Sequence, residues 1–160
     1  MKKTIFILLL SILLTGCSSN ESTNNISDSD EENTEKHTEI LESGVMYYMT
    51  LIISKYSSVD TLATTKEEEQ KILNEALTDV NIAVNEMQHE YDSEIPAIKE
   101  LNQLADAVIY AINDLLEGNY NTKLENSEKV GNYIGEISRN YLDGELPSVI
   151  KSMTGLENAN

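Results

Sequence analysis

Few residues of this chain combine the type and the spacing that chemistry requires. Glu86 and His89 are three positions apart, which places a carboxylate and an imidazole on one face of a helix, where they could bind a metal ion. A dinuclear metal site in a helical bundle requires two such pairs and further inward glutamates. The only other histidine is His37, so we expect no dinuclear site. A single surface ion at Glu86, His89 and Glu90 is an alternative to a solvated polar face.

A second acidic group lies closer to the N-terminus. Asp28, Asp30 and Glu32, followed by Glu39, partly match the spacing of a calcium-binding loop. Asn33 replaces the glycine that allows the sharp turn of such a loop. We therefore expect a solvated acidic segment here rather than a calcium site.

Patterns typical of enzymes are missing from the sequence. It contains no Gly-x-Ser-x-Gly motif and no glycine-rich phosphate loop. Its many acids could supply a carboxylate pair for glycoside cleavage, but the chain has no tryptophan to form a sugar platform. We therefore expect a protein that is not an enzyme and that uses no cofactor or metal.

The only cysteine, Cys17, follows a short apolar segment near the N-terminus. Two lysines precede the apolar run 5–14, and the small residues Thr15 and Gly16 separate that run from Cys17. A basic start, a short apolar segment and small residues before a cleavage point are typical of a secretory signal. The run is too short for an uncleaved transmembrane helix, which needs roughly 20 apolar residues.

The sequence Leu14-Thr15-Gly16-Cys17 resembles the lipobox of bacterial lipoproteins. This resemblance implies that residues 1–16 are removed as a signal peptide and that the thiol of Cys17, the new N-terminus, receives a diacylglycerol. Two or more acyl chains hold a protein stably at a membrane. The expected location is therefore the extracytoplasmic face of the cell membrane, with a Gram-positive surface favoured over an outer membrane. Cleavage by an ordinary signal peptidase, which would release a secreted protein, is the alternative.

The composition limits the partners of the rest of the chain. With 11 Lys and Arg against 28 Asp and Glu, its formal net charge is −17. Such a surface repels nucleic-acid phosphates and anionic lipid headgroups, so we expect neither as a direct ligand, whereas a cationic partner is compatible. Residues 17–36 are polar and acidic, and Ile26 is their only large apolar residue. We expect a disordered tether there, carrying the lipid on Cys17.

From residue 37 to residue 160 the apolar residues recur at intervals of three and four positions, which predicts an all-α domain. We expect an antiparallel bundle of four main helices and a short C-terminal helical segment. Their approximate ranges are 39–56, 65–91, 93–117, 122–142 and 147–153.

Local signals mark several of these boundaries. Thr65 and Glu68 form a capping box at the start of the second helix. Pro96 is compatible with the first turn of the third helix, and Gly118 with its left-handed end. In the fourth helix, Gly131 and Gly135 have the spacing that allows close approach of another helix. We expect a tight internal crossing there, with a groove for a partner as the alternative.

Together these features favour a membrane-anchored interaction or accessory module, including immunity or exclusion roles, with an unidentified protein partner. This hypothesis predicts an exposed apolar or tyrosine patch around Tyr47, Tyr120 or Tyr133. The alternative is a receptor or sink for a small or cationic ligand. That function requires a cavity of roughly 300 Å³ or more with converging polar groups.

Overall fold

The structure is a computed structural model, and it describes residues 36–155. Within this range the chain is helical, as predicted. Its elements are α1 (Glu42–Leu62), α2 (Lys66–Glu90), α3 (Pro96–Leu116), the 3₁₀ turn η1 (Tyr120–Thr122), α4 (Lys123–Tyr141) and α5 (Ser148–Thr154). The predicted signal, Cys17, the acidic residues 18–35 and most of the candidate calcium loop lie outside the described residues.

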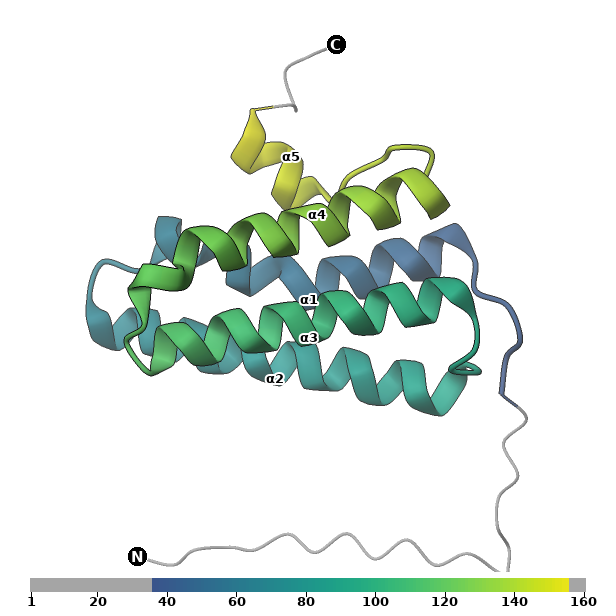
Figure 1. Cartoon of the computed structure of the whole chain (residues 1–160), viewed down its shortest axis with the longest axis horizontal. Coiled ribbons are helices and arrows are strands. Elements are labelled where there is room, and N and C mark those ends of the chain that lie inside the picture. The colour runs from purple at the N-terminus through teal and green to yellow at the C-terminus, as the bar shows by residue number, and fades with distance from the viewer. Residues whose placement is uncertain (1–35, 156–160) are drawn as a thin grey trace, which may run out of the picture. The chain divides into compact units, whose positions relative to one another are not determined.

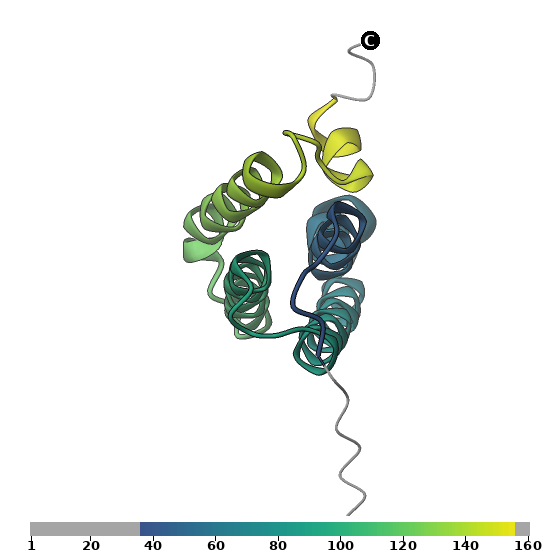
Figure 2. The ribbon, with the colours of Figure 1, turned by 90° about the vertical axis from the view of Figure 1, so that its right-hand side faces the viewer.

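The four main helices form two layers of antiparallel pairs, α1 with α2 and α3 with α4 (Figures 1 and 2). These two pairs have the most extensive helix packing. Short connections make successive helices antiparallel neighbours. Helix α3 also packs against α1 and α2, whereas α4 barely touches α1. The short α5 packs against α1. The prediction of an antiparallel bundle of four main helices is confirmed.

Helix α3 has the widest buried face of the bundle. Its apolar residues Ile98, Leu101, Leu104, Val108 and Ile112 are fully enclosed. Burial of one such side chain stabilises a fold by roughly 1.5–3 kcal/mol. A face this wide requires more than one neighbour, which explains why α3 contacts the other three main helices.

The predicted boundary signals act as expected at α2 and α3. The hydroxyl of Thr65 accepts a bond from the Glu68 amide at 3.2 Å, and the Glu68 carboxylate accepts one from the Thr65 amide at 3.2 Å. This reciprocal pair satisfies amides that have no partner within the helix. Pro96 is the first residue of α3, and Gly118 follows its end with a φ of 84°.

Helix α1 is longer at its C-terminal end than the sequence predicts. It continues through Ser57 and Ser58 to Leu62. Serine is a weak helix former, which is why the apolar period suggests an end near Tyr56. Val59, three positions after Tyr56, is nevertheless only 3% exposed. Its burial against the core stabilises the last turns, so tertiary packing overrides the local preference.

The expected tight crossing at Gly131 is wrong. A Cβ atom added at Gly131 would meet nothing within 4 Å, and one added at Gly135 would meet the side chain of Arg139 on the same helix. The buried stripe of α4 contains Val130 and Ile134 instead. Because these two residues face the core, helical geometry turns Gly131 away from it.

Candidate functional site

Helix α1 has a second face beside its buried stripe, on which three large apolar side chains lie among polar ones. These residues recur at intervals of three and four positions, so they lie on one face of the helix. With one residue of α2, they line an open and mainly apolar depression of about 490 Å³. We name this depression the α1 groove. Its lining residues are Ser43, Met46, Tyr47, Thr50, Leu51, Ser54, Lys55 and Asp79.

Three large side chains form the floor of the α1 groove. Tyr47 is 53% exposed. Met46 and Leu51 are half-buried and reach the edge of the core. Helix α1 has apolar residues around most of its circumference, and its neighbours cover only part of that surface. The groove lies on the part that stays uncovered.

Carboxylates of α2 form one wall of the groove. The ammonium group of Lys55 lies 3.4 Å from Glu75 and 3.3 Å from Asp79, so one cation is shared by two acids. The hydroxyl of Tyr47 donates to Glu86 at 3.4 Å. The negative charge of Glu86 raises the pKa of Tyr47 above its ordinary value. The wall therefore keeps a negative potential.

The opposite side of the groove is also acidic. Glu42 and Glu145 line a smaller depression of about 210 Å³ that shares Ser43 and Met46 with the α1 groove. The ammonium group of Lys151 lies 2.6 Å from Glu145. The two sides together present five carboxylates and two ammonium groups around an apolar floor.

A cluster of aromatic rings supports the Tyr47 end of the groove. The buried Tyr48 donates to Glu90 at 3.0 Å, and its ring makes edge contacts with Tyr47 and Tyr91, with centroid distances of 5.0 and 6.1 Å. Burial, assisted by Glu90, raises the pKa of Tyr48 far above its ordinary value. The bond from Tyr48 to Glu90 joins this end of α1 to α2, and the ring of Tyr48 packs against that of Tyr47.

The first described residues are attached to the same end of the bundle. The His37 amide donates to the Glu90 carbonyl at 2.8 Å, and the His37 carbonyl accepts from the Asp92 amide at 2.9 Å. The rings of His37 and Tyr91 lie 5.6 Å apart. These contacts join the chain before α1 to the connection between α2 and α3.

The candidate metal ligands are not assembled into a site. Glu86 and Glu90 accept hydrogen bonds from Tyr47 and Tyr48, and His89 is exposed. Within residues 36–155, no group of three or more His, Cys, Asp or Glu side chains has an arrangement that could hold a metal ion. Glu39, the last member of the candidate calcium loop, is exposed.

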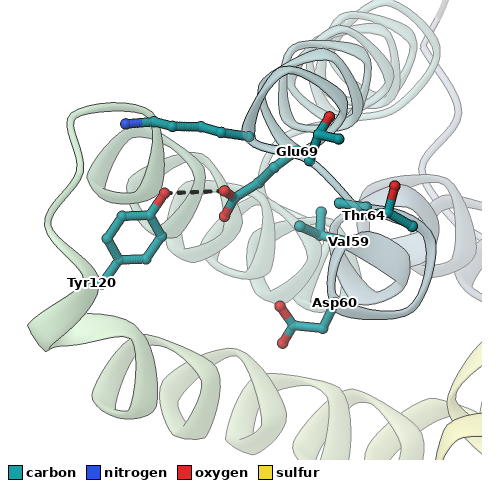
Figure 3. A pocket seen from close by; sticks show the side chains of 8 residues that line it. Val59, Asp60, Thr64, Glu69 and Tyr120 are labelled. Carbon is teal, nitrogen blue, oxygen red and sulfur yellow. Dashed lines mark hydrogen bonds between the residues drawn. The ribbon is translucent and has the colours of Figure 1, made fainter.

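A second open pocket, of about 450 Å³, lies at the other end of α1 (Figure 3). We name it the η1 pocket; it is lined by Val59, Asp60, Ala63, Thr64, Thr65, Lys66, Glu69 and Tyr120. The Tyr120 hydroxyl donates to Glu69 at 3.0 Å, which raises the pKa of Tyr120. Asp60 forms an ion pair with Lys123. The two acids of this pocket, Asp60 and Glu69, are therefore matched by two nearby lysines, Lys66 and Lys123.

A polar junction behind η1 connects α3 to α4. Asp114 accepts hydrogen bonds from the Thr122 hydroxyl at 2.6 Å and from the amide group of the buried Asn126 at 2.9 Å. Because both bonds favour the ionised carboxylate, the pKa of Asp114 is lowered. The junction fixes the turn that carries Tyr120.

The tyrosines that the sequence singles out have different environments. Tyr47 and Tyr120 are 53% and 44% exposed, whereas Tyr133 is half-buried and packs against the core. Sequence reasoning missed Met46 and Leu51 as surface residues of the groove. The available signal was that α1 has more apolar residues than one buried stripe can hold.

Among residues 36–155, no helix has both the length and the apolar character needed to cross a membrane. The chain matches no protein-family model, no curated protein and no solved structure.

Proposed function

We propose that the protein is a lipoprotein, anchored through Cys17 at the extracytoplasmic face of the cell membrane, whose helical domain docks a protein partner without catalysing a reaction. The sequence of residues 1–17, with its short apolar run and lipobox, supports the anchor. The observation that carries the docking function is the α1 groove, because it leaves apolar side chains open on an otherwise acidic domain.

The groove has the properties of a site for a helix of another protein. Its lining residues on α1 extend from Ser43 to Lys55. At 1.5 Å per residue this is about 18 Å, the length of roughly three helical turns. Amphipathic helices bind such grooves through apolar anchors at helical spacing. Tyr47 belongs to a residue type that often dominates binding energy.

The anchor is tested with the substitution Cys17→Ser in the native host. We expect the wild-type protein to be found in the membrane fraction, with acyl chains on its N-terminal cysteine by mass spectrometry. The Cys17→Ser protein should carry no lipid. A free thiol on the mature wild-type protein would refute the anchor.

Docking is tested by placing a photo-cross-linking amino acid at position 47 in intact cells. Position 110 on α3 is the matched control, because Tyr110 is 56% exposed and Tyr47 is 53% exposed. We expect a discrete cross-linked product from position 47 but not from position 110, and its loss when Ser54→Arg blocks the groove floor. Equal products from both positions would contradict docking at this groove.

An alternative function is that of a receptor for a small or cationic ligand. The observation that favours it is the η1 pocket, whose volume of about 450 Å³ is sufficient for such a ligand. Asp60 and Glu69 are its acidic groups, and a cation would have to compete with Lys123 and Tyr120 for them. Thermal-shift titration with polyamines tests this function, which requires a shift that Glu69→Gln abolishes.

A further inference from the structure

We infer that the occupant of the α1 groove is a cationic amphipathic helix, a peptide segment with one apolar stripe flanked by Lys or Arg. This inference rests on the proposed docking function and names the chemistry of the partner. Three observations support this inference. They are the apolar floor of the groove, its two acidic sides, and the negative charge of the other possible occupants.

The floor requires an apolar stripe at helical spacing. Met46, Tyr47 and Leu51 are the large residues of the floor, and the smaller Ser43, Thr50 and Ser54 lie between and beside them. Small residues alternating with large ones leave room for side chains of a second helix. A helix of four or five turns would cover the groove of about three turns and extend past both ends.

The carboxylates on the sides of the groove favour a partner that carries positive charge. Glu75, Asp79 and Glu86 are four and seven positions apart along α2, so their carboxylates follow one edge of the helix beside the groove. Lys55 is the cation next to the first two, and Glu86 is bonded to the uncharged hydroxyl of Tyr47. A partner that brings Lys or Arg along this edge gains attraction, whereas an acidic partner is repelled.

The opposite side of the groove also carries carboxylates. Glu42 and Glu145 lie across the shared residues Ser43 and Met46, and Lys151 pairs with Glu145. A helix seated on the apolar floor is therefore flanked by carboxylates on both edges. This arrangement matches a peptide whose basic residues flank an apolar stripe.

Other occupants are disfavoured by charge. A second copy of the chain would bring the same acidic sides against this groove. The chain's own residues 18–35 contain six acids and no Lys or Arg. An anionic membrane surface would be repelled as well. The groove therefore selects a basic partner over these alternatives.

The test is a binding titration of residues 17–160 with Cys17→Ser. This chain lacks both the apolar run 5–14 and the lipid, either of which would itself bind an amphipathic peptide. The probe is a fluorescently labelled 18-residue peptide of Leu and Lys with its leucines on one helical face. The control probes are a peptide of the same composition in scrambled order and one in which Glu replaces every Lys. We expect binding of the first probe at least tenfold tighter than of either control.

Matched variants locate the binding. The triple variant Glu75→Gln, Asp79→Asn and Glu86→Gln should weaken binding at least tenfold. The control triple Asp106→Asn, Glu125→Gln and Glu128→Gln changes the net charge equally, at exposed positions of α3 and α4 that do not line the groove. Because charges beyond about 8 Å are screened at physiological salt, its effect should be less than twofold. Ser54→Arg should also weaken binding at least tenfold, and circular dichroism checks that every variant is folded.

Several outcomes would overturn the inference. These are no binding of the amphipathic peptide, equal binding of the scrambled peptide, or equal weakening by the two triple variants. A dimer in sedimentation experiments that Ser54→Arg dissociates would assign the groove to a second copy instead. If position 47 captures a partner in cells while the cationic peptide does not bind, the docking function stands and the partner chemistry is wrong. If position 47 captures nothing, the docking function itself fails.

Discussion

The α1 groove and the η1 pocket have similar volumes, about 490 and 450 Å³, but different chemistry. The groove has an apolar floor between sides that carry more carboxylates than ammonium groups. Around the η1 pocket, Asp60 pairs with Lys123 and Glu69 with Tyr120, and Lys66 adds a second cation. Charges there are balanced within the chain.

This difference shows that the size of a surface depression says little about its role. In the η1 pocket the polar contacts join residues far apart in the sequence, such as Tyr120 and Glu69, and so they hold α2 to the turn before α4. In the α1 groove the apolar floor is open, and only two ammonium groups face the five carboxylates of its sides. We therefore propose the α1 groove, rather than the η1 pocket, as the main binding site.

The prediction with the largest expected effect compares two adjacent tyrosines of α1, one in the core and one on the groove floor. Tyr48 is 3% exposed and Tyr47 is 53% exposed. Tyr48→Ala should lower the free energy of unfolding by about 3–5 kcal/mol, as for other large buried aromatic residues. Tyr47→Ala should change it by less than about 1 kcal/mol, because it removes mostly solvated surface. Urea denaturation followed by circular dichroism measures both, and an equal loss would make the groove floor a structural element.

The next test breaks the junction beside the η1 pocket. Asn126→Ala removes a buried amide that donates to Asp114 at 2.9 Å, so we expect a loss of about 1–2 kcal/mol in the free energy of unfolding. Binding at the α1 groove should not change. Urea denaturation and the peptide titration measure the two effects, and a parallel loss of both would contradict the separation of the two regions.

The same substitution should have a defined pH dependence. The hydrogen bonds from Thr122 and Asn126 lower the pKa of Asp114, so they stabilise the fold above the unfolded pKa of about 4. This stabilisation is lost as the pH falls through the lower, folded pKa. The difference in stability between the wild type and Asn126→Ala should therefore shrink below about pH 4. A constant difference from pH 7 to pH 3 would contradict the role of the ionised carboxylate.

A smaller effect is expected at the edge of the η1 pocket. Thr65→Ala removes the hydroxyl that caps α2 at a distance of 3.2 Å, and such changes typically cost about 1 kcal/mol. Thermal unfolding measures the loss, and Thr61→Ala on α1, whose exposed hydroxyl bonds Ser58 within its own helix, serves as the control. A larger loss for the control would show that the capping box is not what stabilises this end.

The smallest change in the free energy of unfolding is predicted at a surface that lies in neither the α1 groove nor the η1 pocket. Gly131→Ala on α4 adds a methyl group where no atom lies within 4 Å. The substitution should raise the free energy of unfolding by about 0.5–1 kcal/mol, because alanine favours a helix over glycine. Guanidinium denaturation measures the gain. A loss would mean that Gly131 is packed after all, as its spacing with Gly135 suggested.

Much of the fold followed from local patterns. The helices, the Thr65–Glu68 capping box, Pro96 at the start of α3 and Gly118 after its end could be predicted because each depends on residues a few positions apart. The candidate site was only partly predictable. Tyr47 could be named, but whether Met46 and Leu51 reach the surface depends on which neighbours cover α1.

The sequence by itself determined that residues 37–155 form helices of nearly these lengths, whereas the lipid anchor on Cys17 stays a prediction from residues 1–17. The tertiary structure decided which side of α1 stays open, that Val59 extends this helix, and that Gly131 faces outward. The physical reason is the range of the interactions. Helix periodicity and capping act within a few residues, whereas the cover of a helix face depends on contacts such as that of Tyr47 with Glu86, which are 39 positions apart.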